Sequence, residues 1–253
     1  TIEKVDLDKA INFYKDRFSD AGDFTFIFVG NFDKEKIKPM LEKYLGSLRT
    51  TERGENWRDV GMYPPTGKIE KTTKKGIEAQ SFVRLIISGK FDWNPEEKYL
   101  VNSMMKVFNT RLREVLREDK GGTYGVGCWA SPNHFPRDEY QVNIVWGCSP
   151  DRCDSLIGNA LDIVKEMNEN APDSLNMVKV KETQRREYEV NLKENRYWLS
   201  KLNDAYFYEE DPKGILDLPN RIEKLTAEDI HKTSKKYLNQ QNFARFVLLP
   251  ENK

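Results

Sequence analysis

The chain has 253 residues, of which 38% are hydrophobic and 32% are charged, and this composition is typical of a globular protein. Its 41 basic and 41 acidic residues give a formal net charge of zero, whereas a nucleic-acid partner would require a basic surface. No apolar run approaches the ~20 residues needed to span a bilayer. We therefore expect neither a nucleic-acid partner nor a membrane span in this segment.

The first 50 residues predict a helix, a strand and a second helix. Apolar residues recur at helical spacing in residues 6–18, where Asp6 can cap the helix. DFTFIFVGN, residues 23–31, predicts an apolar strand, and residues 33–48 again have helical spacing. A polar stretch rich in glycine and proline follows at residues 50–67, so we place a domain boundary near residue 50.

The second part, residues 51–253, begins with two predicted strands and a long helix. KIEKTTK and EAQSFVRLIISGKF have strand patterns, and in the latter Val83, Leu85 and Ile87 share one face. Asn94-Pro95 predicts the start of a helix that runs to about Asp119, because asparagine caps helices and proline suits their first turn.

The remainder predicts a hairpin, three helical stretches and a closing strand. The hairpin joins TYGVGCWAS to EYQVNIVWG, and helices are predicted after Ser149-Pro150 and after Asp173. Thr226 begins a short amphipathic helix, and FARFVLLP predicts the last strand. These elements indicate an α+β fold in two layers, with an antiparallel-rich sheet packed on helices.

The two ends of the chain resemble each other. Ile2-Glu3-Lys4 matches Ile222-Glu223-Lys224, and each is followed by a capped helix and an apolar strand, with Phe24 opposite Phe243. The identities are few, so coincidence is an alternative. If the repeat is real, the chain holds the tail of one structural copy and then a complete second copy. We therefore expect an internal piece of a longer protein.

Metal and nucleophile chemistry is sparse in this sequence. His134 and His231 stand far apart, neither has a second ligand one helical turn away, and a zinc site needs three or four ligands. We expect no metal site in this segment. Three cysteines exclude a complete disulfide framework; Cys148 and Cys153 could pair, although buried thiols are favoured.

Arg117 and Tyr124 are the candidate site residues, on either side of Gly121-Gly122. At ~100° per residue, Arg117 falls opposite Phe108, the centre of its helix's apolar stripe. It therefore faces away from its own core. The alternative is a solvated arginine paired with Glu114, a half-buried strand tyrosine and a glycine helix end.

Resemblance to a known family bears on these alternatives. RLREVLREDKGGTYGVG, with EYQVNIVWGCSP and DRCDSLIGNALDIVKEM downstream, resembles the last domain of the pitrilysin/insulinase family of zinc metallopeptidases. The segment from FYKDRFSDAG to EKYLGSL resembles the closing part of the preceding domain in that family. NLKENRYWLSKL is similar to members of the bacterial branch.

The resemblance implies a fold and different roles for the two halves of the protein. It implies a metallopeptidase/LuxS-like domain preceded by the tail of a homologous domain. In this family two halves close around a peptide or small protein, and the N-terminal half carries zinc in an inverted H-x-x-E-H motif. Carried over, Arg117 and Tyr124 would bind substrate, through a guanidinium fork and a hydroxyl that donates to the oxyanion. This segment would hold no zinc and no catalytic residue of its own.

A second function remains open on the sequence. The same fold occurs in non-catalytic scaffold and partner subunits, including one subunit of mitochondrial processing peptidase. An inverted zinc motif upstream would distinguish the peptidase from the scaffold. The resemblance favours a periplasmic or cell-envelope location, whereas free thiols disfavour an oxidising compartment. The substrate is not indicated.

Overall fold

The computed structural model describes residues 2–51, 53–119 and 123–251. The chain divides into two compact units, each formed from two stretches of sequence. Unit 1 comprises Thr1–Trp57 and Glu187–Leu218, and unit 2 comprises Arg58–Arg186 and Pro219–Lys253. None of the helices in the described ranges is both long and apolar enough to cross a membrane.

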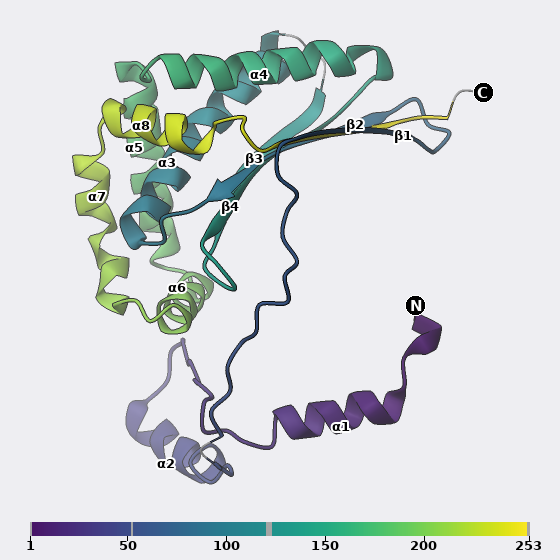
Figure 1. The fold of residues 1–253 in the computed structure, drawn as a ribbon. Coiled ribbons are helices and arrows are strands. Elements are labelled where there is room, and N and C mark those ends of the chain that lie inside the picture. Colours follow the sequence, from purple (N-terminus) through teal and green to yellow (C-terminus); the bar gives the residue numbers. More distant parts are fainter. Residues whose placement is uncertain (1, 52, 120–122, 252–253) are drawn as a thin grey trace. The chain divides into compact units, whose positions relative to one another are not determined.

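Unit 2 is built around a five-stranded sheet with the order β1-β5-β2-β4-β3 (Figure 1). The strands are β1 (Lys68–Lys74), β2 (Ser81–Lys90), β3 (Thr123–Asn133), β4 (Glu139–Cys148) and β5 (Phe243–Leu249). β1 and β5 are parallel, and the other three pairs are antiparallel. The predicted hairpin is β3–β4, and the closing strand β5 lies inside the sheet rather than at its edge.

Helices cover one face of this sheet (Figure 1). They are α3 (Pro95–Arg113), α4 (Cys153–Glu169), α5 (Ser174–Asn191), α7 (Leu218–Lys224) and α8 (Ala227–Tyr237), with a short 3-10 turn η3 (Pro150–Arg152) before α4. α3 packs on β3, while α4 and α8 pack on β2. The predicted fold class, an α+β domain with an antiparallel-rich sheet packed on helices, is confirmed.

The core lies between the sheet and the helices. Val83, Leu85 and Ile87 of β2 are fully buried, whereas Phe82 and Arg84, which alternate with them, are exposed. Successive strand side chains point to opposite faces, so this alternation follows from one covered and one uncovered face. The facing α3 residues Met104 and Phe108 are also fully buried.

The predicted helix starts are confirmed by their caps. The Asn94 side-chain oxygen accepts a hydrogen bond from the Glu97 N–H at 2.8 Å, and Pro95 occupies the first turn of α3. Thr226 and Asp229 form a reciprocal capping box at α8. Each side chain satisfies a backbone donor that the first helical turn leaves without a partner.

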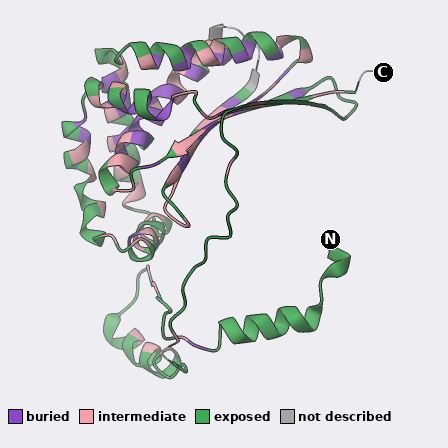
Figure 2. Ribbon diagram, in the orientation of Figure 1, coloured by how far each residue is buried: buried purple, intermediate pink, exposed green. Residues whose placement is uncertain are grey.

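Unit 1 contains helices with little burial. They are η1 (Ile2–Lys4), α1 (Leu7–Arg17), α2 (Lys34–Tyr44), α6 (Asn195–Phe207) and η4 (Pro212–Asp217). Neither α1 nor α2 contains a buried residue; α1 is exposed along its length, and in α2 only Ile37 and Leu41 are partly buried (Figure 2). Asp20 links two segments of unit 1, since its carboxylate accepts hydrogen bonds from the N–H groups of Gly22, Thr51 and Arg53.

The strand predicted over residues 23–31 does not form. The segment is extended, but it pairs with no other strand among the described residues. A strand requires a neighbour to bond its N–H and C=O groups, and the described part of unit 1 contains no second strand. The apolar pattern therefore predicted a strand that is not formed in the described part of the chain.

Burial on one face of the sheet predicts a difference between two leucines. Leu85→Ala removes a fully buried side chain, so we expect it to lower the free energy of unfolding of unit 2 by about 2–5 kcal/mol. Leu248→Ala, the matched control on the uncovered face, should cost well under half as much, because Leu248 is 42% exposed. Urea denaturation of both variants measures this. Equal losses would contradict the assignment of the two faces.

Candidate functional site

The candidate site lies where α3 gives way to β3. α3 ends at Arg113 and continues as a π-helical segment, η2 (Glu114–Asp119), before β3 begins at Thr123. Arg117 belongs to η2 and Tyr124 is the second residue of β3. Their side chains, like Gly121 and Gly122, lie outside the described residues. The roles assigned to the pair therefore remain predictions.

The direction that the sequence predicts for Arg117 depends on a regular α-helix up to that residue. The angular count from Phe108 assumed α-helical geometry as far as Asp119, but that geometry ends at Arg113. A π-helix bonds residue i to i+5 and has more residues in each turn, so the count does not hold beyond that point. Such single π turns occur frequently at functional sites.

The start of β3 is irregular as well. Thr123 pairs with Cys148 and Gly125 pairs with Gly147, so Tyr124 is one extra residue opposite a continuous β4. This is a β-bulge, which leaves its extra residue outside the regular pairing and changes the direction of the strand. Bulges are common beside active sites for that reason. The two candidate residues thus belong to two consecutive departures from regular geometry.

Described neighbours anchor this junction. Leu116 of η2 is fully buried and Val126 of β3 is buried, so both sides are attached to the core. Glu114 accepts a hydrogen bond from Arg111 at 3.0 Å and lies 3.5 Å from the ammonium of Lys179. The carboxylate proposed as the partner of a solvated Arg117 is therefore already bound by two other cations.

The uncovered face of the sheet adds an apolar surface beside the junction. The sheet register places Trp129, Phe82, Phe246 and Leu248 on this face, each between 37% and 47% exposed. Arg84 lies among them, and its guanidinium donates two hydrogen bonds to Oδ1 of Asn143, at 3.1 and 2.7 Å. Aromatic groups and a fixed cation suit an extended peptide.

β3 is also an edge strand. The sheet order leaves its outer side without a strand partner among the described residues. Main-chain N–H and C=O groups on such an edge can bond an extended peptide, which adds as a further strand. The candidate residues, the open edge and the apolar face therefore all involve β3.

Comparison with known proteins identifies the family. Residues 4–183 match the model described as the Peptidase M16 inactive domain. The chain belongs to this family. The resemblance to pitrilysin/insulinase zinc metallopeptidases is thereby confirmed.

Relatives agree with this assignment. A curated "Probable zinc protease PqqL" from Haemophilus influenzae is 24% identical over 253 residues, which cover 96% of this chain and 26% of the relative. The crystal structure of the periplasmic protease PqqL from Escherichia coli has a TM-score of 0.74 at 17% identity, covering 88% of this chain and 25% of that one. The chain thus spans about a quarter of the curated relatives it matches.

The fold also matches a crystal structure of half of the same relative. The crystal structure of the first half of Escherichia coli PqqL has a TM-score of 0.69 at 14% identity, covering 87% of this chain and 50% of that one. The likeness concerns the fold alone.

The M16 inactive domain shows no metal centre in the part of the chain described. No group of three or more His, Cys, Asp or Glu side chains there could hold a metal ion. Nδ1 of His134 lies 2.5 Å from Oδ1 of Asp138, and its ring stacks on Trp93. Nε2 of His231 lies 3.1 Å from the carbonyl oxygen of Asn168. Each histidine has its own local partner, and the two do not converge.

The cysteines are thiols in this structure. Sγ of Cys148 and Sγ of Cys153 lie 3.5 Å apart, and both residues are buried. Burial raises the pKa of Cys148 to about 12, and it also raises the pKa of Cys128 to about 12. Thiols with such pKa values stay protonated at neutral pH and are poor nucleophiles. We assign them no catalytic part.

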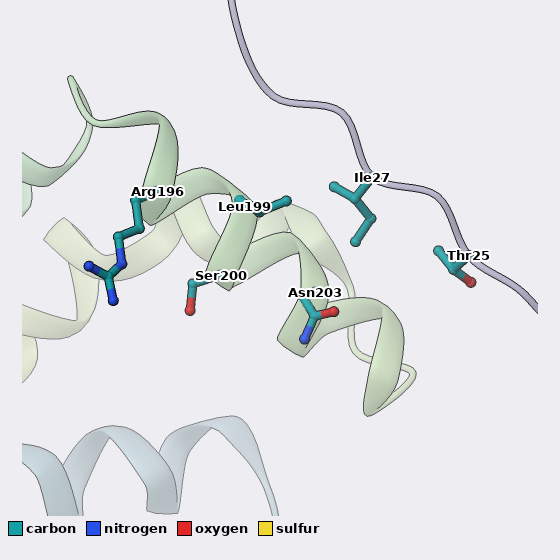
Figure 3. Close-up of a pocket in the computed structure, with 6 residues that line it drawn as sticks. All are labelled: Thr25, Ile27, Arg196, Leu199, Ser200 and Asn203. Atoms are coloured by element: carbon teal, nitrogen blue, oxygen red, sulfur yellow. The ribbon is translucent and has the colours of Figure 1, made fainter. Parts of the chain in front are cut away.

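Unit 1 contains an open hollow of about 460 Å³ (Figure 3). Thr25 and Ile27 line it from the extended segment, and four α6 residues line the other side: Arg196, Leu199, Ser200 and Asn203. The lining contains one cation but no carboxylate, histidine or thiol, so it lacks a pair for acid–base or nucleophilic chemistry. We assign it no reaction.

Sequence reasoning missed the uncovered face as a surface. The alternation in β2 puts Phe82 on the face opposite Leu85, but it does not indicate that the face of Phe82 has no helical layer in the described part of the chain. That depends on which layer covers the sheet. The signal that could have found the surface is the aromatic content of this face, since an exposed strand face is ordinarily polar.

The lack of a ligand cluster among the described residues predicts the outcome of a metal analysis. The chain, incubated with zinc and dialysed, should retain no stoichiometric metal, because a tight site needs three or four converging ligands. Elemental analysis by plasma mass spectrometry measures the ratio. One tightly held zinc per chain would show that residues outside the described ranges complete a site.

Proposed function

We propose that this chain is the non-zinc-binding portion of a zinc metalloendopeptidase and that it contributes peptide binding and oxyanion support. The zinc would be held by the N-terminal half of the same protein, and the chain alone would be inactive. The family description, an inactive domain, and the zinc-protease description of the relatives support this proposal. The whole protein's activity is part of the proposal, because the chain spans only a quarter of those relatives.

The observation that carries the proposal is the surface around β3. An apolar sheet face, an unpaired strand edge and two irregular backbone segments meet there. A peptide lying along the edge strand would bond the β3 main chain and place side chains near Trp129 of that strand. Neither general acid–base groups nor a metal is needed on this side, since water activation would take place at the zinc.

Arg117 and Tyr124 would act at the end of this surface. A guanidinium presents a planar fork that bonds a peptide carbonyl or carboxylate through two hydrogen bonds. A tyrosine hydroxyl donates a hydrogen bond to the oxyanion that forms when zinc-bound water attacks the amide carbon. The bulge and the π turn would direct the two side chains away from the regular packing of strand and helix.

The domain boundary near residue 50 and the compartment belong to the same proposal. Residues 1–50 would be the tail of the preceding homologous domain, and residues 51–253 a complete last domain. A periplasmic location is supported by the description of Escherichia coli PqqL as a periplasmic protease. Cell fractionation tests the location, and recovery in the cytoplasm would refute it.

A non-catalytic partner subunit is the alternative that the family description also fits. The two functions differ in the N-terminal half. An intact H-x-x-E-H motif there favours the peptidase, and its absence favours the scaffold. Sequencing that half decides between them.

Tyr124→Phe tests oxyanion support. In the enzyme extended to the length of its relatives, we expect kcat to fall by ~10-fold or more, as the loss of one oxyanion donor can produce. Tyr206→Phe is the control, because it removes the same hydroxyl from an exposed position on α6. Turnover of a fluorogenic peptide at saturation gives kcat. Wild-type turnover in Tyr124→Phe would contradict the role of Tyr124 in oxyanion support.

Arg117→Lys tests substrate binding separately. Lysine keeps the charge but lacks the planar fork. Because one charge-assisted hydrogen bond to the substrate is lost, we expect KM to rise by roughly 10-fold, with a smaller change in kcat. Steady-state kinetics on the same peptide separates the two constants. Unchanged KM and kcat would remove Arg117 from the substrate site.

A further inference from the structure

Cys148 and Cys153 lie together at the turn that joins the sheet to the helical layer. Cys148 is the last residue of β4, Cys153 is the first residue of α4, and the 3-10 turn η3 lies between them. Their Sγ atoms are 3.5 Å apart, so the two sulfurs are in contact. Two thiols in contact can be joined into a disulfide, provided that the backbone on either side holds them there.

The backbone fixes both cysteines. Cys148 pairs with Ser81 of β2 on one side and with Thr123 of β3 on the other, so it is held within the sheet. The N–H of Cys153 donates a hydrogen bond to the carbonyl oxygen of Pro150, which closes the turn before α4. Cys148 is 1% exposed and Cys153 is 4% exposed. The contact between the sulfurs is therefore a product of folding, and it is lost when the chain unfolds.

A disulfide would leave no buried polar group without a partner at this turn. The two thiols interact with each other, and Sγ of Cys153 lies 3.9 Å from the carbonyl oxygen of Ser149. That oxygen also accepts a hydrogen bond from the N–H of Arg152 at 3.0 Å. Oxidation removes both S–H donors, and the Ser149 carbonyl keeps its bond to Arg152. Only weak hydrogen bonds of sulfur are lost.

Two other uses of a thiol pair do not fit this site. A tight metal site needs three or four ligands, and no third His, Cys, Asp or Glu joins the pair among the described residues. A thiol pair that exchanges disulfides with other molecules must be accessible to them, whereas both of these residues are buried. Burial instead suits a disulfide that stays intact once it has formed.

We infer that Cys148 and Cys153 are a disulfide site, and that folding in an oxidising environment joins them covalently. The oxidant is a small-molecule or protein disulfide, RSSR. The thiolate of one cysteine attacks RSSR and releases one RSH, and the thiolate of the other attacks the mixed disulfide and releases the second RSH. Two electrons and two protons pass to the oxidant, whose S–S bond breaks as the new S–S bond forms.

Burial determines when this exchange takes place. It raises the pKa of Cys148 to about 12, so the folded thiol is rarely in the thiolate form that attacks a disulfide. The cysteines of the unfolded chain are accessible and have ordinary thiol pKa values. The bond therefore forms as the chain folds, and the core then protects it. The inference goes beyond the proposed function, since it requires neither substrate nor zinc.

A redox titration tests the inference. The 253-residue chain is refolded in mixtures of reduced and oxidised glutathione, alkylated and digested, and the link between Cys148 and Cys153 is quantified by mass spectrometry. The same titration in concentrated urea gives the value for the unfolded chain. We expect the equilibrium constant for disulfide formation to be at least ~10-fold larger in the folded chain, because folding holds the sulfurs in contact. An equal or smaller constant would overturn the inference.

Urea denaturation provides a second measurement. If folding favours the disulfide ~10-fold, the disulfide must favour the folded state by the same factor, because the two equilibria are linked. The oxidised chain should therefore unfold at a higher urea concentration than the chain kept reduced with a phosphine. Equal midpoints in the two forms would contradict the inference.

Two variants assign the effect to this pair. Cys128→Ala is the matched control, since Cys128 pairs with Ile144, which is four residues, or about 13 Å, from Cys148 along β4. The control should keep both the link and the redox-dependent midpoint. Cys153→Ala should unfold at the same urea concentration in oxidising and reducing buffer. A redox-dependent midpoint in Cys153→Ala, or its loss in Cys128→Ala, would show that another cysteine pair is responsible.

Discussion

The structure of unit 2 depends on β2, which pairs with β4 on one side and β5 on the other. Its alternate residues Val83, Leu85 and Ile87 are fully buried against the helical layer. Burial of such side chains is the main favourable contribution to folding. A one-residue slip would expose all three and bury Arg84, so the alternation fixes the register of the whole sheet.

Burial of one face of the sheet does not explain the composition of the other face. A single helical layer can satisfy only one face, and an uncovered face is ordinarily polar. Here that face carries Trp129, Phe82 and Phe246. An exposed apolar surface of this kind indicates an interaction site. The fixed guanidinium of Arg84 adds a polar group that orients a bound chain, as binding sites typically require.

Local signals in the sequence were sufficient where the physics is local. Asn94-Pro95 and Thr226 predicted two helix starts, because a cap bonds a donor within three residues of itself. The sequence could not place β5 between β1 and β2, since that pairing joins residues far apart in the chain. Nor did it indicate the π turn, because EVLRED has the composition of an ordinary helix.

Residues 23–31 show most clearly what a pattern can and cannot predict. FTFIFV and FARFVLL have similar local preferences, yet FARFVLL is an inner strand whereas FTFIFV pairs with no strand in the described part of the chain. Intrinsic strand preference contributes at most about 1 kcal/mol per residue, so neighbouring strands and a packed face decide the outcome. The surroundings of each segment therefore decide whether it becomes a strand.

This reasoning also bears on the candidate site. Arg117 and Tyr124 were identified through resemblance, since their composition fits a helix end and a strand equally well. The structure adds a π turn and a bulge at their positions, and both features displace side chains from regular packing. We propose that both features free the side chains of Arg117 and Tyr124 for a substrate held between two halves of the protein.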